Sequence, residues 1–138
     1  MSVSKSKVLL VEDSKFLRIA TGRALSKAGF TVSTAADGEQ ALQFASEQLP
    51  DIIVLDMMLP KLSGQDVLKA LKADPATMDI PVIVLSSLSQ KNEEKLVSEG
   101  AAAYFEKSTL ELDKNSDRLA AIIQTTLAGA SRLRKLHS

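Results

Sequence analysis

Several charged and polar residues of this 138-residue chain come directly after short apolar runs. Glu12 and Asp13 follow VLLV, and Asp56 follows IIVL. Ser86 follows VIVL, and Lys107 follows YFE. The carboxyl ends of parallel strands meet at one edge of a sheet, which is where such sheets bind ligands. If the apolar runs are strands of this kind, three carboxylates, a hydroxyl and an ammonium group converge there.

Carboxylates from separate strands repel one another unless their charge is balanced. A divalent cation provides that balance, and Mg²⁺ prefers hard oxygen ligands and readily shares phosphate oxygens. We therefore predict that Glu12, Asp13 and Asp56 hold Mg²⁺, with Mn²⁺ as the alternative ion. Taken singly, Glu12 and Asp13 would suit the N-terminus of a following helix. Their convergence with Asp56 favours the metal site.

Phosphoryl transfer to a carboxylate is the chemistry that these residues fit. Asp56 would be the nucleophile and would form an aspartyl phosphate, while the metal ion and Lys107 balance charge on the phosphoryl oxygens. A carboxylate is already ionised at neutral pH, so no general base is needed. The only histidine, His137, stands next to last in the basic stretch SRLRKLHS and is interpreted as a solvated residue.

Five apolar runs recur along the chain and supply the strands that would hold these residues. They are rich in Val, Ile and Leu, as is typical of strands buried on both faces. The five runs cover residues 7–11, 31–35, 52–55, 81–85 and 102–105. Segments with the spacing of amphipathic helices lie between them, and a longer one runs from about residue 115 to 136. The alternation predicts an α/β fold with a doubly wound, five-stranded parallel sheet flanked by five helices.

Boundary residues agree with these elements. Gly29 and Gly100 are predicted to end helices, because glycine adopts the left-handed conformation found there. Gly22 is in conflict with its helix, where glycine costs about 1 kcal/mol relative to alanine. Four residues of the types preferred at helix N-caps stand before the helical segments: Ser14, Asp37, Ser63 and Ser89.

The composition limits the kind of protein. Lys plus Arg and Asp plus Glu each number 17, so no net charge attracts nucleic acid, and no direct nucleic-acid binding is expected. The absence of cysteine excludes disulfides and thiolate metal sites and suits a reducing cytoplasm. No apolar stretch is long enough to span a bilayer, and the first residues lack the apolar core of a signal peptide. We expect a cytoplasmic protein without membrane association.

Four stretches, LLVEDS, VLDMMLPKLSG, PVIVLSS and GAAAYFEK, occur in the order and spacing of one known family. Together they resemble the receiver domain of two-component response regulators, of the chemotaxis-regulator type, over nearly the whole chain. The resemblance implies a flavodoxin-like strand order of 2-1-3-4-5. It implies a receiver domain over residues 1–128, followed at 129–138 by a basic tail, helical or frayed, that could begin a linker.

The resemblance also implies roles for the residues of the metal site. Asp56 matches the phosphoacceptor, and Glu12 with Asp13 matches the acidic pair that holds Mg²⁺. Met58 matches the position whose backbone carbonyl is the third protein ligand of the ion. The PKLSG stretch matches the loop that follows the acceptor.

Further residues match positions that bind the phosphoryl group or respond to it. Ser86 and Lys107 match its hydrogen-bonding and charge-pairing partners. Tyr104 matches an aromatic switch that responds together with Ser86, although an aromatic residue near a strand end is often only a packing residue. Met58 and Leu88 match the positions that tune hydrolysis, and both are apolar here, so we expect a long-lived aspartyl phosphate.

One position departs from the family. Its lysine is usually followed by proline in a cis peptide, whereas Ser108 follows Lys107 here. A cis bond before a residue other than proline costs about 2.5 to 4 kcal/mol, so the cis peptide is not carried over. We therefore expect that the loop after Lys107 can follow a path different from that of the family.

The resemblance implies a phosphorylation-activated switch without turnover of an external substrate. A sensor histidine kinase or a phosphotransfer protein would donate the phosphoryl group, and the protein would assist its own phosphorylation and dephosphorylation. A change at the surface of the fourth helix, fifth strand and fifth helix would signal to a downstream protein target. A phosphorylation-dependent homodimer is a further option.

Three other classes of protein share parts of this pattern. Phosphatases of the haloacid dehalogenase type carry a second Asp two residues after the nucleophile, and Met58 stands there. A flavin-binding module would place a phosphate at the loop after the first strand, where Glu12 and Asp13 would repel it. The alternative that stays open is a receiver-like interaction module that works without phosphorylation, although the intact charged residues favour the phosphorylated switch.

Overall fold

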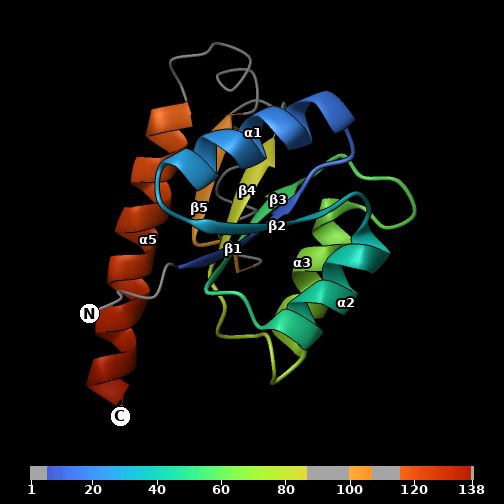
Figure 1. The fold of residues 1–138 in the computed structure, drawn as a ribbon. Coiled ribbons are helices and arrows are strands. Elements are labelled where there is room, and N and C mark those ends of the chain that lie inside the picture. Colours follow the sequence, from blue (N-terminus) through green and yellow to red (C-terminus); the bar gives the residue numbers. More distant parts are fainter. Residues whose placement is uncertain (1–5, 87–99, 107–115, 138) are drawn as a thin grey trace.

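A single sheet of five parallel strands forms the centre of the molecule (Figure 1). The computed structural model describes residues 6–86, 100–106 and 116–137. The strands are β1 (Lys7–Val11), β2 (Thr31–Ala35), β3 (Ile52–Asp56), β4 (Val82–Ser86) and β5 (Ala103–Glu106). Their order is β2-β1-β3-β4-β5, and every neighbouring pair is parallel. The predicted fold class and strand order are thereby confirmed.

Three strands differ from the prediction by one residue: β3 ends one residue later, and β4 and β5 each begin and end one residue later. β3 extends to Asp56, which pairs in register with Leu85 of β4. β4 begins at Val82 because Pro81 has no backbone N–H to donate, although its carbonyl still accepts from the N–H of Ile53 at 3.0 Å. The carboxylate of Asp56 therefore belongs to the last residue of a strand that is hydrogen-bonded on both sides.

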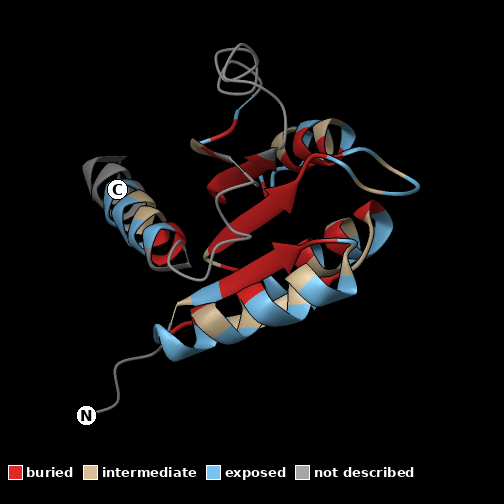
Figure 2. Ribbon diagram, turned by 90° about the horizontal axis from the view of Figure 1, so that it is seen from above, coloured by how far each residue is buried: buried red, intermediate tan, exposed pale blue. Residues whose placement is uncertain are grey.

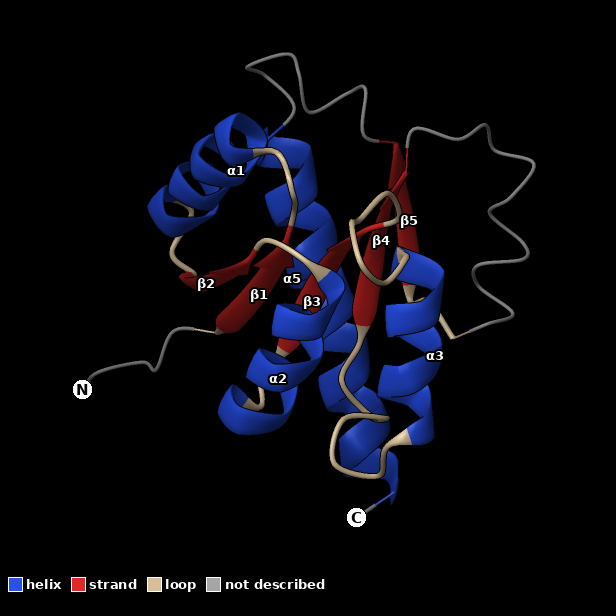
Figure 3. Ribbon diagram, turned by 90° about the vertical axis from the view of Figure 1, so that its right-hand side faces the viewer, coloured by secondary structure: helices blue, strands red, loops and turns tan. Residues whose placement is uncertain are grey.

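Helices cover both faces of the sheet (Figure 3). Those described are α1 (Lys15–Lys27), α2 (Gly38–Gln48), α3 (Gly64–Ala73) and α5 (Ser116–His137). The predicted helix around Leu96 and its N-cap Ser89 lie outside the described residues. No helix of the described ranges combines the length and apolarity needed to cross a membrane. α5 runs on to His137, and the division at residue 128 stays a prediction.

Three predicted N-caps are confirmed. Ser14 Oγ accepts from the N–H of Leu17 at 3.4 Å, and Asp37 Oδ1 accepts from that of Gln40 at 2.8 Å. Ser63 Oγ likewise accepts from the third residue of α3, at 3.1 Å. Gly29 ends α1 with φ of 105°, the conformation predicted for it. Each of the first three helices therefore starts at a defined residue, directly after a loop at the carboxyl edge of the sheet.

Two apolar cores lie on opposite faces of the sheet (Figure 2). Alternate residues of a strand point to opposite faces, so Leu9 and Val11 enter one core while Val8 and Leu10 enter the other. The first core packs against α2 and α3, and the second packs against α1 and α5. β1, β3 and β4 are buried from both sides and form a rigid base for residues at their carboxyl ends.

Candidate acidic site at the carboxyl edge of the sheet

Three carboxylates predicted to converge do so in the structure. Ligand oxygens of Glu12, Asp13 and Asp56 all lie within 4.8 Å of one another. Glu12 is only 2% exposed and Asp56 is 0% exposed, whereas Asp13 is exposed to solvent. Two carboxylates are therefore held inside the protein, and the third stands at the rim.

The loop from β1 to α1 holds the first two carboxylates. The N–H of Glu12 donates to the carbonyl of Ala35 at 3.0 Å, which extends the pairing of β1 with β2 by one residue. Glu12 Oε1 accepts from the N–H of Ser14 at 3.2 Å. Ser14 then begins α1, so the chain turns directly from the acidic pair into a helix.

A basic residue of α1 contacts the backbone of this loop. Arg18 Nη1 donates to the carbonyl of Glu12 at 3.0 Å and lies 3.4 Å from that of Asp13. A guanidinium is a fixed positive charge with several donors, so it both orders these carbonyls and partly balances the nearby carboxylates. The sequence offered no reason to single out Arg18, because α1 contains four basic residues in all.

Asp56 is held by the strand that carries it and by the next two residues. Oδ1 of its carboxylate accepts from the N–H of Met58 at 3.1 Å. The N–H of Met57 donates to the carbonyl of Leu85 at 3.0 Å, so the chain stays attached to β4 beyond the end of β3. The side chain of Met58 is 63% exposed, so this residue combines an apolar surface with a backbone next to the carboxylate.

The loop from β3 to α3 folds back over Asp56. The N–H of Gly64 donates to the carbonyl of Met57 at 3.0 Å. An added Cβ at Gly64 would lie 2.5 Å from Met57 Cα and would also meet the carbonyl oxygen of Asp56. Only a residue without a side chain permits this approach, because real Cβ atoms are not found so close to backbone atoms. The loop containing Pro60 and Gly64, which the sequence places after the acceptor, therefore packs against the backbone of Asp56 and Met57.

The same loop also contacts the start of α2. Lys61 has φ of 69°, an uncommon conformation for a residue with a side chain. Its Nζ lies 3.7 Å from carboxylate oxygens of both Asp37 and Glu39. Lys61 and Glu39 are exposed, so their ion pair contributes little energy, whereas Asp37 is partly buried. Both pairs lie on the side of the loop facing α2. Nothing in the sequence predicted this role for Lys61.

The donor set of the acidic site fits a hard divalent cation. All three candidate ligands are carboxylates, and two of them are buried close together. Such an arrangement concentrates negative charge where solvent screens it poorly. Carboxylate oxygens are the ligands that Mg²⁺ and Mn²⁺ prefer. The chemistry of the residues therefore suits a bound metal ion.

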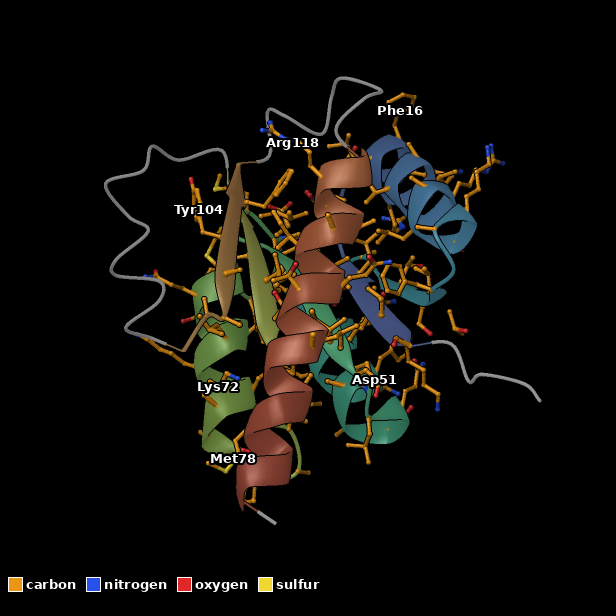
Figure 4. All side chains as sticks on the ribbon, turned by 90° about the vertical axis from the view of Figure 1, so that its left-hand side faces the viewer. Phe16, Asp51, Lys72, Met78, Tyr104 and Arg118 are labelled. Carbon is orange, nitrogen blue, oxygen red and sulfur yellow. The ribbon has the colours of Figure 1, made fainter. Side chains whose placement is uncertain are left out.

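The remaining predicted site residues are described to different extents. Ser86 is the last residue of β4, and its side chain is outside the described part of the structure. Tyr104 of β5 is half-buried and packs against the core on the α2 and α3 side (Figure 4). Lys107, Ser108 and Leu88 lie outside the described residues. Convergence is thus observed for the acidic half of the predicted site.

The fold and this acidic edge correspond to a known class of protein. Residues 8–123 match the family of response regulator receiver domains. Because the match spans most of the chain, the protein belongs to this family, which provides the receiver domains of two-component systems. The family resemblance of the sequence is thereby confirmed.

Individual relatives agree with this membership. The chain is 44% identical over 91 residues to the transcriptional regulatory protein PrrA of Mycobacterium leprae, covering 66% of this chain and 38% of the relative. It is 33% identical over 126 residues to the alkaline phosphatase synthesis transcriptional regulatory protein PhoP of Bacillus subtilis, covering 91% and 52% respectively. The chain thus spans less than two thirds of the length of these relatives.

A solved structure shows the same architecture. The crystal structure of a response regulator from Desulfuromonas acetoxidans superposes on the chain with a TM-score of 0.78 at 31% identity. The superposition covers 89% of this chain and 97% of the other. The strands and helices of this chain are therefore arranged as in a solved response regulator.

Proposed function

We propose that this receiver accepts a phosphoryl group on Asp56 from a histidine kinase or a phosphotransfer protein, in a reaction that depends on Mg²⁺. The observation that carries the proposal is the cluster of Glu12, Asp13 and Asp56 in a chain of the receiver family. The same proposal assigns no external substrate to the protein, because Asp56 itself is the acceptor. The absence of cysteine agrees with a place in the reducing cytoplasm.

The residues around Asp56 have separable tasks in this proposal. An oxygen of the Asp56 carboxylate attacks phosphorus as the bond from phosphorus to the donor nitrogen breaks. The N–H of Met58 orients that carboxylate through its hydrogen bond to Oδ1. Glu12, Asp13, Asp56 and the carbonyl of Met58 would hold Mg²⁺, which when bound neutralises charge on the phosphoryl oxygens. Ser86 and Lys107 would bind the phosphoryl group.

Access to Asp56 is a requirement of the mechanism. The residue is 0% exposed in the structure, so a donor can reach its carboxylate only after neighbouring groups move. The carboxylate of Asp13 is already exposed at the rim of the same cluster. The proposed order is therefore an encounter at the exposed rim, followed by uncovering of Asp56.

The output of the proposed switch is a change of surface. Tyr104 and Ser86 would respond together to the phosphoryl group, and the surface that includes β5 and α5 would then meet a downstream protein target. β5 forms one edge of the sheet, so a shift of Tyr104 at that strand can reach the surface without disturbing the central strands. A phosphorylation-dependent homodimer through this surface is part of the same proposal.

Mass spectrometry of the intact protein tests the acceptor. Wild type incubated with acetyl phosphate and Mg²⁺ should gain one phosphoryl group, and chelation of the metal should prevent the gain. Asp56→Asn should gain none. Asp79→Asn is the matched control, because it removes an exposed carboxylate from the turn before β4, at the opposite edge of the sheet. Equal labelling of Asp56→Asn and wild type would show that the acceptor is wrong.

The lifetime of the phosphorylated form tests the role of Met58. Its exposed apolar side chain cannot orient an attacking water, so we expect slow hydrolysis of the aspartyl phosphate. Met58→Asn introduces a side chain with hydrogen-bonding groups and should accelerate decay several-fold in excess Mg²⁺. Met58→Leu is the apolar control and should decay like wild type. A Met58→Asn protein that decays no faster would contradict this role.

A further inference from the structure

A groove lies between α1 and β2, and apart from Arg18, which contacts the acidic loop, its lining residues have no part in the proposed phosphoryl transfer. Its volume is about 450 Å³. α1 crosses one face of the sheet beside β2 (Figure 1), and β2 is the edge strand. The groove is therefore open along one side of the molecule. It is lined by Arg18, Ile19, Gly22, Arg23, Ser26, Lys27, Val32 and Thr34.

The charge of this groove is of one sign. Arg18, Arg23 and Lys27 line it, and no carboxylate does. α1 contains a fourth basic residue, Lys15, and no acidic residue. The ion pairs found between described residues join Lys61 to Asp37 and Glu39, and neither carboxylate lines the groove. Since the whole chain has a net charge of zero, the positive charge is concentrated locally.

The floor of the groove is apolar and open. Two apolar lining residues are Ile19, which is 44% exposed, and Val32 of β2, which is half-buried. A Cβ added to Gly22 would make only ordinary contacts, 3.9 Å from Thr34 Cγ2 and 4.0 Å from Val32 Cγ1. The fold therefore does not need glycine at this position, although glycine weakens a helix. Its effect is to leave space between the helix and the edge strand.

We propose that this groove docks an extended, acidic segment of a partner protein in which apolar and acidic side chains alternate. The acidic side chains would pair with Arg23 and Lys27, and the apolar ones would lie over Ile19 and Val32. β2 pairs only with β1 in the described sheet, so the groove is open along this edge and an extended segment can enter it. The phosphate backbone of a nucleic acid binds mainly to positive charges and would make little use of an apolar floor. A segment with both acidic and apolar side chains can contact the cations and the floor together.

A labelled peptide tests the groove in the unphosphorylated full-length chain. The probe is a fluorescein-labelled peptide in which Asp or Glu alternates with Val, and the control peptide has Lys in place of each acid. Fluorescence anisotropy should show saturable binding of the acidic peptide alone, weakened by added salt. Amide NMR shifts should be largest at Gly22, Ser26 and Val32. Shifts centred elsewhere, or no saturable binding, would overturn the proposal.

Charge-reversal variants separate the groove from general electrostatics. The double variant Arg23→Glu, Lys27→Glu should weaken peptide binding at least tenfold. The matched double variant Lys69→Glu, Arg118→Glu changes the net charge equally at exposed sites on α3 and α5, and it should bind within twofold of wild type. Equal losses in both would contradict the proposal. Arg18 is left unchanged because it contacts the acidic loop.

Two further measurements decide between ligands and protect the test against misfolding. Gly22→Leu should fill the groove and weaken peptide binding at least tenfold while circular dichroism stays unchanged. A DNA duplex or anionic lipid vesicles that displace the labelled peptide more strongly than unlabelled peptide does would contradict the proposal. The groove would then bind that class of ligand and not an acidic peptide. Phosphorylation of the Arg23, Lys27 variant by acetyl phosphate should match wild type, so failure of docking and failure of the acceptor assignment are distinguishable.

Discussion

On the side of the sheet covered by α2 and α3, backbone segments approach so closely that they exclude a side chain, whereas on the α1 side a Cβ at Gly22 would make only ordinary contacts. A Cβ at Gly38 would lie 2.6 Å from Leu62 Cβ, and one at Gly64 would lie 2.5 Å from Met57 Cα. The nearest atoms to a Cβ at Gly22 would be 3.9 Å away. Glycine thus serves close packing on the first side and leaves an open groove on the second.

The two sides meet different requirements of a signalling domain, namely a fixed acceptor carboxylate and an accessible surface. The loop that follows Asp56 is wedged between β3 and the start of α2, which keeps the acceptor carboxylate in place. The groove beside α1 has no such restraint, and its residues contribute exposed charge and apolar surface. Among the described residues, Arg18 belongs to both regions, because it lines the groove and contacts the acidic loop.

The largest effect is expected for Gly64→Ala. The added methyl group would overlap the backbone of Asp56 and Met57, so the loop must move. We expect a loss of about 2 to 3 kcal/mol in the free energy of unfolding, measured with urea, and slower phosphorylation of Asp56. Gly129→Ala is the control, because no atom lies within 4 Å of its added Cβ. Equal stability of the two variants would contradict the close-packed loop.

A smaller effect is expected for Arg18→Gln. The variant weakens the hydrogen bonds from α1 to the carbonyls of Glu12 and Asp13 and removes a nearby positive charge. Charge-assisted hydrogen bonds of this kind contribute about 1.5 to 3 kcal/mol, and we expect part of this as a threefold to tenfold weaker affinity for Mg²⁺. The two effects oppose each other, since removing a cation by itself favours cation binding.

Isothermal titration calorimetry with Mg²⁺ measures that affinity directly. Arg23→Gln is the matched control, because it removes the same charge from the same groove and leaves the hydrogen bonds of Arg18 to the acidic loop in place. Arg18→Lys should lie between Arg18→Gln and wild type. If Arg18→Gln binds Mg²⁺ more tightly than wild type, charge outweighs positioning, and Arg18 does not order the loop for metal binding.

The smallest effect is expected for Gly22→Ala, and its sign is opposite to that of Gly64→Ala. Alanine fits the helical conformation and has room above Val32 and Thr34. The free energy of unfolding should rise by about 0.5 to 1 kcal/mol in urea denaturation. A destabilised Gly22→Ala protein would show that α1 packs more tightly on β2 than described, and the contrast between the two sides would then fail.

Much of the fold could be predicted because its signals are local. Strands buried on both faces require continuous apolar runs, and the runs before Glu12 and Asp56 were recognised on that basis. Ser14, Asp37 and Ser63 were predicted as caps because a short polar side chain can accept the first free N–H groups of a helix. The strand order came from the family resemblance, since order in a sheet is not a local property.

The sequence by itself determined which residues stand at strand ends, and hence that Glu12, Asp13 and Asp56 share one edge of the sheet. Tertiary structure alone decided how they are held: Arg18 reaches the acidic loop, Lys61 faces α2, and Gly64 lies against the backbone of Asp56. The physical reason is that strands buried on both faces leave a recurring pattern of apolar runs in the sequence, and this pattern shows which residues end each strand. Contacts between separate loops depend on distances that arise only when the helices pack on the sheet.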